Sequence, residues 1–190
     1  MPSIRGISNW YESAQIEYFT PFMKLWLCFN SWYKHVFPRI RTDADAIREI
    51  KMGGQIKDSF SNLLDSTSED AKEFKKALSI LIQEIRLGPL EDMSGIEICF
   101  RESDIAVTYT KRKITSELQS NGIIQLEGEI YVISNTEILF RETIDVIYQV
   151  RCHLIHGAFD IEDRRAKRLV KNSYIVLEKI LKPVIAGGPE

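Results

Sequence analysis

The sequence predicts a mainly α-helical protein with a small β-containing insertion. Apolar residues recur at helical spacing over most of the chain. Residues 95–133 break this pattern with short alternating or β-branched runs that are separated by turn residues. The chain has 190 residues, 44% hydrophobic and 27% charged, which is typical of a folded protein with one sizeable core. We therefore expect a bundle of about five helices in a single domain over 9–183, with short tails at 1–8 and 184–190.

The first part of the chain is predicted to be helical. Helical spacing begins at Asn9, and Thr20-Pro21 is typical of an N-cap followed by proline at the first helical position. A strongly apolar helix starts there, or continues there with a kink, and it is expected to end at Pro38. A shorter helix over Asp43–Lys51 should end at Gly53-Gly54.

Two more helical segments are expected before the insertion. The apolar residues of 56–64 indicate one of them. Ser66, followed three residues later by Glu69, is a capping-box signature that opens the next helix, and Gly88-Pro89 ends it. Within the insertion, Lys111–Gln119 could form a short helix between strands.

Two long helices are expected after the insertion. Asn135 is a suitable N-cap for a helix that continues to Ile155 and stops before Gly157. The last helix is predicted over about Glu162–Leu181, with Pro183 and the glycines that follow it as the stop.

Charge and cysteine content narrow the functional classes. A net charge of −2 gives no general attraction to nucleic acid, so such binding would need a local patch. Cys28, Cys99 and Cys152 are scattered among apolar residues, which suits buried reduced thiols and does not suit a structural zinc site. No apolar run has membrane-spanning length, and the N-terminus lacks a signal-peptide pattern. We expect a cytoplasmic protein with no metal, cofactor or membrane association.

The segment Arg151-Cys152-His153-Leu154-Ile155-His156-Gly157 contains the residues best suited to chemistry. Arginine binds phosphate as a planar fork, and histidine can exchange a proton near neutral pH. Arg151 and His156 lie ~140° apart on a regular helix, so they approach each other only if the last turn unwinds at Gly157 or the arginine reaches around. An ordinary helix end also explains the pattern, because cations and a following glycine are favoured there.

Two segments resemble HEPN domains. Arg151 with four residues before His156 fits the Arg-x(4–6)-His motif of that superfamily, and Gly157 and the long last helix are also similar. The segment Trp26-Leu-Cys-Phe29-Asn30 resembles the Trp-x-x-Phe-Asn helix of several HEPN families. The resemblance covers residues 9–183. It implies a homodimeric helical bundle that acts as a metal-independent endoribonuclease, in a toxin–antitoxin or phage-defence setting, with the motif helices of both subunits in a shared cleft.

The resemblance also implies residue roles. Arg151 would stabilise the scissile phosphate, and His156 would move protons during attack by the ribose 2′-hydroxyl, leaving a 2′,3′-cyclic phosphate. Apart from the resemblance, an amide in a strongly apolar helix needs hydrogen-bond partners, so Asn30 could bond the motif helix and orient His156, or make a local structural hydrogen bond. His153 could serve as a further polar partner. Many active members carry a polar residue directly after the arginine, where this chain has Cys152. The alternatives are an inactive HEPN module that binds RNA, a nucleotide or a protein, and a purely structural interaction domain.

A run of five cations follows the motif and is a candidate RNA-binding surface. Its members are Arg164, Arg165, Lys167, Arg168 and Lys171. The alternative is a solvated face of the last helix. The partners expected are therefore RNA, a second copy of the chain, and a cognate antitoxin or defence protein.

Overall fold

The computed structural model describes residues 17–92, 94–98, 100, 106–108, 123–126, 131–133, 135–160 and 162–187. It confirms a mainly α-helical fold with a small β-containing insertion. The tail predicted at 1–8, the helical pattern starting at Asn9 and the short helix over Lys111–Gln119 lie outside the described residues.

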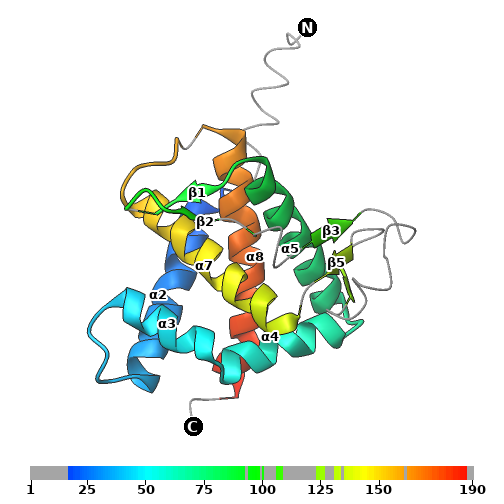
Figure 1. Cartoon of the computed structure of the whole chain (residues 1–190). Helices are drawn as coiled ribbons and strands as arrows, with labels where there is room; N and C mark the ends of the chain where they lie inside the picture. The colour runs from blue at the N-terminus through cyan, green and yellow to red at the C-terminus, as the bar shows by residue number, and fades with distance from the viewer. Residues whose placement is uncertain are drawn as a thin grey trace, which may run out of the picture.

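Six helices and five short strands make up the regular structure of the described residues. The helices are α2 (Phe19–Val36), α3 (Asp43–Met52), α4 (Gln55–Asp65), α5 (Glu69–Leu87), α7 (Thr136–Ile155) and α8 (Arg164–Ala186). Helix α8 runs through the middle of the bundle and packs against α5, α2 and α4 (Figure 1). Helix α7 contacts α3, α4 and α8, so it closes one side of the bundle.

The strands form two small antiparallel sheets. Strand β1 (Leu90–Glu91) pairs with β2 (Glu97–Ile98), and this hairpin contacts α7. Strands β3 (Ala106–Thr108), β4 (Ile123–Gln125) and β5 (Tyr131–Ile133) form a second sheet in the order β3-β5-β4, drawn beside α5 in Figure 1. Strands β2 to β5 confirm the predicted β structure between residues 95 and 133, whereas β1 begins before it.

Two helix starts differ from the sequence prediction. Helix α2 begins at Phe19, because the carboxylate of Glu17 accepts the backbone N–H of Phe19 and, at 3.3 Å, that of Thr20. Pro21 then lies in the first turn, where a missing N–H leaves no bond unmade. Helix α5 is capped by Ser68, whose hydroxyl accepts the Ala71 N–H at 3.2 Å, and not by the predicted Ser66.

The last helix is longer than predicted. Helix α8 continues past Pro183 to Ala186, into the segment expected to be a C-terminal tail. Proline prevents a helical bond only to the residue four positions before it. The next turn closes normally here, since the Gly187 N–H donates to the Pro183 carbonyl at 3.0 Å.

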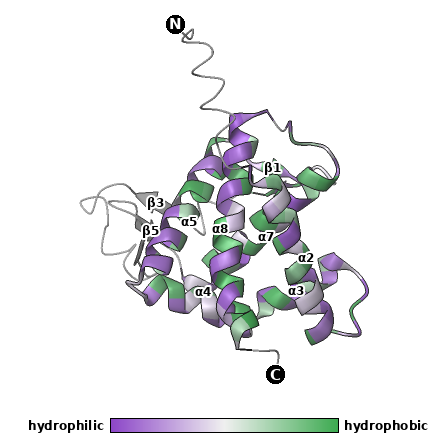
Figure 2. Cartoon of the chain, turned by 180° about the vertical axis from the view of Figure 1, so that it is seen from behind, coloured by the Kyte–Doolittle hydropathy of each residue, from purple (hydrophilic) through white to green (hydrophobic). Residues whose placement is uncertain are grey.

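The hydrophobic core is built around aromatic residues of α2. Phe22, Trp26, Phe29 and Tyr33 are all buried, and the Phe29 ring packs edge-to-face at 5.4 Å from both Trp26 and Tyr33. Figure 2 shows hydrophobic and hydrophilic residues on opposite sides of several helices, as amphipathic packing requires.

One of the cysteine predictions is wrong. The buried positions of α2 leave Cys28 on the opposite side of that helix, so its thiol is exposed. Cys152 is buried and reduced as expected, and Cys99 lies outside the described residues.

None of the described helices is both long and apolar enough to cross a membrane. In the same part of the chain, no group of acidic, histidine and cysteine side chains could hold a metal ion.

Candidate functional site

Arg151 lies near the end of α7, and its side chain lies against α2 and α3. Its Nη2 is 2.9 Å from Oδ2 of Asp43, the first residue of α3. The guanidinium carbon also lies 5.5 Å from the centroid of the Trp26 ring, in a cation–π contact. The side chains of Arg151 and Asp43 are only 19% and 24% exposed, so the ion pair is largely withdrawn from water. Three helices therefore fix the arginine.

Asp43 connects the arginine to α2. Its second oxygen, Oδ1, accepts a hydrogen bond from the Asn30 amide at 3.0 Å, and the same amide nitrogen donates to the Tyr33 hydroxyl. Burial, followed by the neighbouring Asp43 carboxylate, raises the pKa of the Tyr33 phenol well above its usual range. Tyr33 is therefore neutral near physiological pH, and the network carries one negative charge opposite the one positive charge of Arg151.

The local sequence explains the position of Asp43. The hydroxyl of Thr42 accepts the Asp45 N–H at 3.1 Å and so caps α3 immediately before Asp43. A carboxylate in the first turn is favoured by the partial positive charge of the helix N-terminus. The cap thus holds the Asp43 carboxylate at the α2–α3 contact, where Arg151 reaches it.

His156 occupies the C-cap of α7 and its side chain is exposed. Its backbone N–H donates to the Cys152 carbonyl at 3.0 Å, and Gly157 follows with φ of +68°, a conformation that glycine adopts without strain. Among the described residues, no hydrogen bond or ion pair joins His156 to Arg151. The helix end thus presents the imidazole to solvent, separate from the paired arginine.

The predicted role of Asn30 is not supported by its contacts. Its amide bonds Asp43 and Tyr33, and no described hydrogen bond links it to His156. Asn30 does reach the motif helix, but through Asp43 and Arg151. Its partner is therefore the arginine half of the motif and not the histidine half.

His153 ties the end of α7 to the hairpin. Its Nε2 lies 2.6 Å from the carbonyl oxygen of Glu91 in β1, and its ring packs on Phe159 with centroids 5.1 Å apart. These contacts direct it away from Arg151, so it does not replace the missing polar neighbour. The residue at the position directly after Arg151 is Cys152, which is buried. Its sulfur lies 3.8 Å from Nη1 of Arg151, and thiol sulfur is a weak hydrogen-bond acceptor.

Two of the cations proposed to bind RNA are used within the fold. Arg168 Nε lies 2.9 Å from Oε1 of Glu84, a carboxylate whose side chain is only 7% exposed. Arg165 donates to the carbonyl of Gly88, the residue that follows α5, and at 3.1 Å to the carbonyl of Glu84, which also accepts the Gly88 N–H. Both arginines therefore stabilise the α5–α8 contact.

The other three cations of the run are on or near the surface. Lys167 pairs with the exposed Glu162 at 3.1 Å, and the Lys171 ammonium lies 5.5 Å from the Tyr18 ring centroid. Arg164 is exposed at the start of α8. The run thus offers less unpaired positive charge than its sequence suggests.

The residue that sequence reasoning missed is Asp43. An acidic residue at a helix start has an ordinary local explanation, and 108 positions separate it from Arg151. No pattern in the sequence links the two. Only the Asn30 amide, polar within an otherwise apolar helix, signals that a polar partner should lie nearby.

Comparison of the chain with protein-family models, curated proteins and solved structures finds no match. The resemblance to HEPN domains therefore rests on the two segments that suggested it, Trp26–Asn30 and Arg151–Gly157. In the structure these segments face each other, because Arg151 lies over the Trp26 ring and Asn30 bonds the partner of Arg151.

Proposed function

We propose that the protein is a metal-independent endoribonuclease of the HEPN type, with Arg151 and His156 as its catalytic residues. The supporting observation is the arginine that Asp43 and Trp26 hold on the helix whose end carries an exposed histidine. A cation fixed before the reaction stabilises developing charge without a cost of reorganisation. The Nη1 group of Arg151 has only a thiol sulfur as its described partner, so it remains available to a phosphate oxygen.

In the proposed reaction the ribose 2′-oxygen attacks the adjacent phosphorus and the bond to the 5′-oxygen breaks. One group takes the 2′-hydroxyl proton, and another gives a proton to the leaving 5′-oxygen. The products are a 2′,3′-cyclic phosphate and a 5′-hydroxyl. Arg151 offsets the charge on the non-bridging oxygens, while His156 acts as the base or the acid. A single imidazole cannot be both at once, so the His156 side chains of two copies would complete the site.

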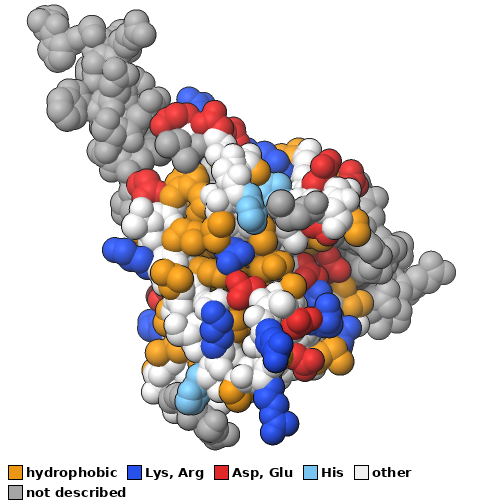
Figure 3. All heavy atoms as spheres, turned by 90° about the vertical axis from the view of Figure 1, so that its left-hand side faces the viewer, with side chains coloured by type: hydrophobic (Ala, Val, Ile, Leu, Met, Phe, Trp, Pro, Cys, Tyr) orange, Lys and Arg blue, Asp and Glu red, His pale blue; other side chains and the backbone are white. Residues whose placement is uncertain are grey.

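We place the contact between the two copies on the face formed by α2 and α7. Leu27 of α2 is 61% exposed, and Ile155, next to His156, is 46% exposed. Figure 3 shows histidine beside a band of hydrophobic side chains on the left-hand side of the molecule as drawn in Figure 1. Burial of such side chains favours association. If the α7 helices of the two copies contact each other on this face, both His156 side chains would lie in one cleft.

A second candidate is a HEPN-type module that binds RNA without cutting it. The observation that favours it is the ion pair of Arg151 with Asp43, because the carboxylate offsets the positive charge that would stabilise the phosphate during cleavage. The buried Cys152 supports it as well, because it leaves Arg151 without a polar neighbour in the motif. This candidate predicts salt-sensitive RNA binding and intact RNA after long incubation.

The experiment that separates the candidates is cleavage of a broad RNA panel in excess EDTA by wild type, Arg151→Ala, His156→Ala and the control His35→Ala. His35 is exposed near the end of α2, so its loss should leave activity unchanged. We expect a fall of at least ~100-fold for each of the other variants. A wild type that cuts none of the RNAs, or activity that survives in both variants, would contradict catalysis. The toxin or defence role, with its cognate partner, is tested by growth arrest on expression of the wild type and of His156→Ala.

A further inference from the structure

We infer that Lys34, in the last turn of α2, and Arg41, in the α2–α3 connection, form a phosphate-binding subsite for RNA beside Arg151. The inference rests on the proposed function for the identity of the ligand, and it adds where the RNA strand lies. It also replaces the α8 run as the main electrostatic contact.

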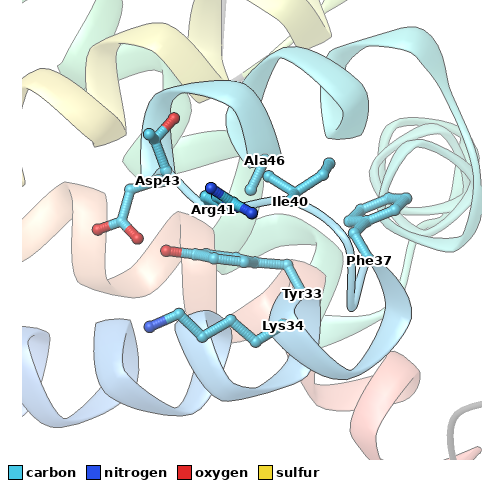
Figure 4. Close-up of a pocket in the computed structure, with 8 residues that line it drawn as sticks. Tyr33, Lys34, Phe37, Ile40, Arg41, Asp43 and Ala46 are labelled. Atoms are coloured by element: carbon cyan, nitrogen blue, oxygen red, sulfur yellow. The ribbon is translucent and has the colours of Figure 1, made fainter.

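Lys34 and Arg41 lie close together at one recess of the surface. Lys34 lies in the last turn of α2 and Arg41 lies two residues before Asp43. Both line a small recess together with Tyr33 and Asp43. In Figure 4 the two cations lie on opposite sides of the Tyr33 ring, and the Lys34 ammonium points to the same side as the Tyr33 hydroxyl and the Asp43 carboxylate. The recess is too narrow to admit a water molecule, so a phosphate would bind across its rim.

The positive charges of Lys34 and Arg41 are available to a ligand. Both Lys34 and Arg41 are exposed, and neither has a partner among the ion pairs that join described residues. The nearby Asp43 is already shared by Arg151 and Asn30. On α8, by contrast, Arg168 and Lys167 are paired with Glu84 and Glu162. Arg164 and Lys171 of α8 also lack an ion pair among the described residues, but they do not line the recess. Lys34 and Arg41 do line it, beside Asp43, and exposed cations of this kind can release counterions from a nucleic acid backbone.

Asp43 connects the recess to Arg151. Asp43 faces the recess and at the same time binds Arg151, so the subsite and the arginine share one residue. An RNA strand whose scissile phosphate meets Arg151 would therefore place a neighbouring phosphate at the recess rim. Such contacts position the backbone and carry no base information, so the subsite would accept any sequence. It would set the register of the strand and not its sequence.

The test is binding of a 2′-O-methyl RNA of about 12 nucleotides, which cannot be cleaved, followed by fluorescence anisotropy over a series of salt concentrations. Wild type is compared with Lys34→Ala/Arg41→Ala and with Arg164→Ala/Lys167→Ala, which removes the same charge from α8. We expect the first double variant to bind at least tenfold more weakly and to lower the log–log salt slope by ~1.4, at ~0.7 per contact. The α8 variant should change affinity less than about twofold, and Lys34→Arg/Arg41→Lys should keep the wild-type slope.

The inference is overturned by an unchanged slope in Lys34→Ala/Arg41→Ala, by an equal loss in the α8 variant, or by a wild type that does not bind this RNA. All four positions are exposed, so we expect each variant to keep the fold, and circular dichroism checks this. The two claims fail separately. A protein that binds through Lys34 and Arg41 but never cuts supports the subsite and contradicts the ribonuclease. A protein that cuts RNA while both double variants bind equally well contradicts the subsite alone.

Discussion

Arg151 and Asp43 form an ion pair with 2.9 Å between Nη2 and Oδ2, although 108 positions separate them in the chain. The carboxylate also accepts a hydrogen bond from Asn30, so one residue links α2, α3 and α7. The pair fixes the arginine and offsets its charge at the same time. Its strength decides how firmly Arg151 is held and how much of its positive charge remains for a phosphate at Nη1.

Asp43→Asn should lower the free energy of unfolding by about 2–3 kcal/mol. The substitution keeps the shape of the side chain but leaves a mostly buried guanidinium without its partner; the figure is below the ~3–5 kcal/mol of fully buried pairs because both groups keep some contact with water. Urea denaturation measures the change. The matched control is Arg48→Ala, which removes an ion pair whose arginine is 72% exposed and should cost less than about 1 kcal/mol. Equal losses of unfolding free energy in the two variants would show that the Asp43–Arg151 ion pair stabilises the fold no more than an exposed pair does.

The two histidines of the motif should separate stability from activity. His153→Ala removes the contact with the Glu91 carbonyl and the packing on Phe159, so we expect a loss of about 1 kcal/mol of stability and retained RNA cleavage. His156→Ala changes an exposed side chain and should alter stability by no more than ~0.5 kcal/mol while cleavage is lost. Thermal unfolding and an RNA cleavage assay on both variants check this. The reverse pattern, with catalysis lost on changing His153, would mean that the wrong histidine has been assigned.

Tyr33 should make the fold sensitive to alkali. Burial raises the pKa of its phenol above the unfolded value of about 10, so its contribution is full below pH 10 and is lost as the pH rises toward the folded pKa. Each such proton reduces stability by ~1.4 kcal/mol per pH unit over that range. Urea denaturation of wild type and Tyr33→Phe between pH 8 and 11 should give a shallower decline for the variant. Parallel declines would remove Tyr33 from this explanation.

Glu84→Gln should destabilise the contact between α5 and α8. The variant leaves Arg168 and Arg165 facing a neutral amide at a position that is 7% exposed, and we expect a loss of roughly 2–3 kcal/mol. The control Glu162→Gln affects only the surface pair with Lys167 and should cost under about 1 kcal/mol. Differential scanning calorimetry compares the two. If Glu84→Gln melts like wild type, the α8 cations are freer than their contacts indicate, and the α8 run regains its claim on RNA.

Local features of the fold could be predicted from the sequence. Asn135 caps α7 as expected, accepting the Ile138 N–H at 2.8 Å, and Gly88 ends α5, because caps and stops depend on a few neighbouring residues. The error at Ser66 has the same origin, since two serines two positions apart, Ser66 and Ser68, are both suitable caps and the sequence does not rank them. Pro183 misled for a similar reason, because proline near a helix end removes only one bond.

Long-range partners could not be predicted. Nothing near Asp43 or Glu84 in the sequence indicates that each accepts an arginine from a helix far along the chain. The α8 run shows the consequence, since five cations within eight positions suggested RNA binding, whereas in the fold Arg165 and Arg168 bond groups of α5. The motif residues could be proposed from the sequence because their spacing and chemistry are local, and their role stays a prediction. The surroundings that decide their availability are tertiary.

The proposed ribonuclease activity is tested most directly by cleavage of an RNA that carries a single 2′-deoxy nucleotide at a mapped cleavage position, in excess EDTA. We predict that wild type cuts the unmodified RNA and leaves a 2′,3′-cyclic phosphate, identified by mass spectrometry. The deoxy substitution should abolish that cut alone, and Arg151→Ala and His156→Ala should abolish all cuts. Cleavage at the deoxy position, or products that appear only when a divalent metal is added, would contradict 2′-hydroxyl attack at an Arg151/His156 site.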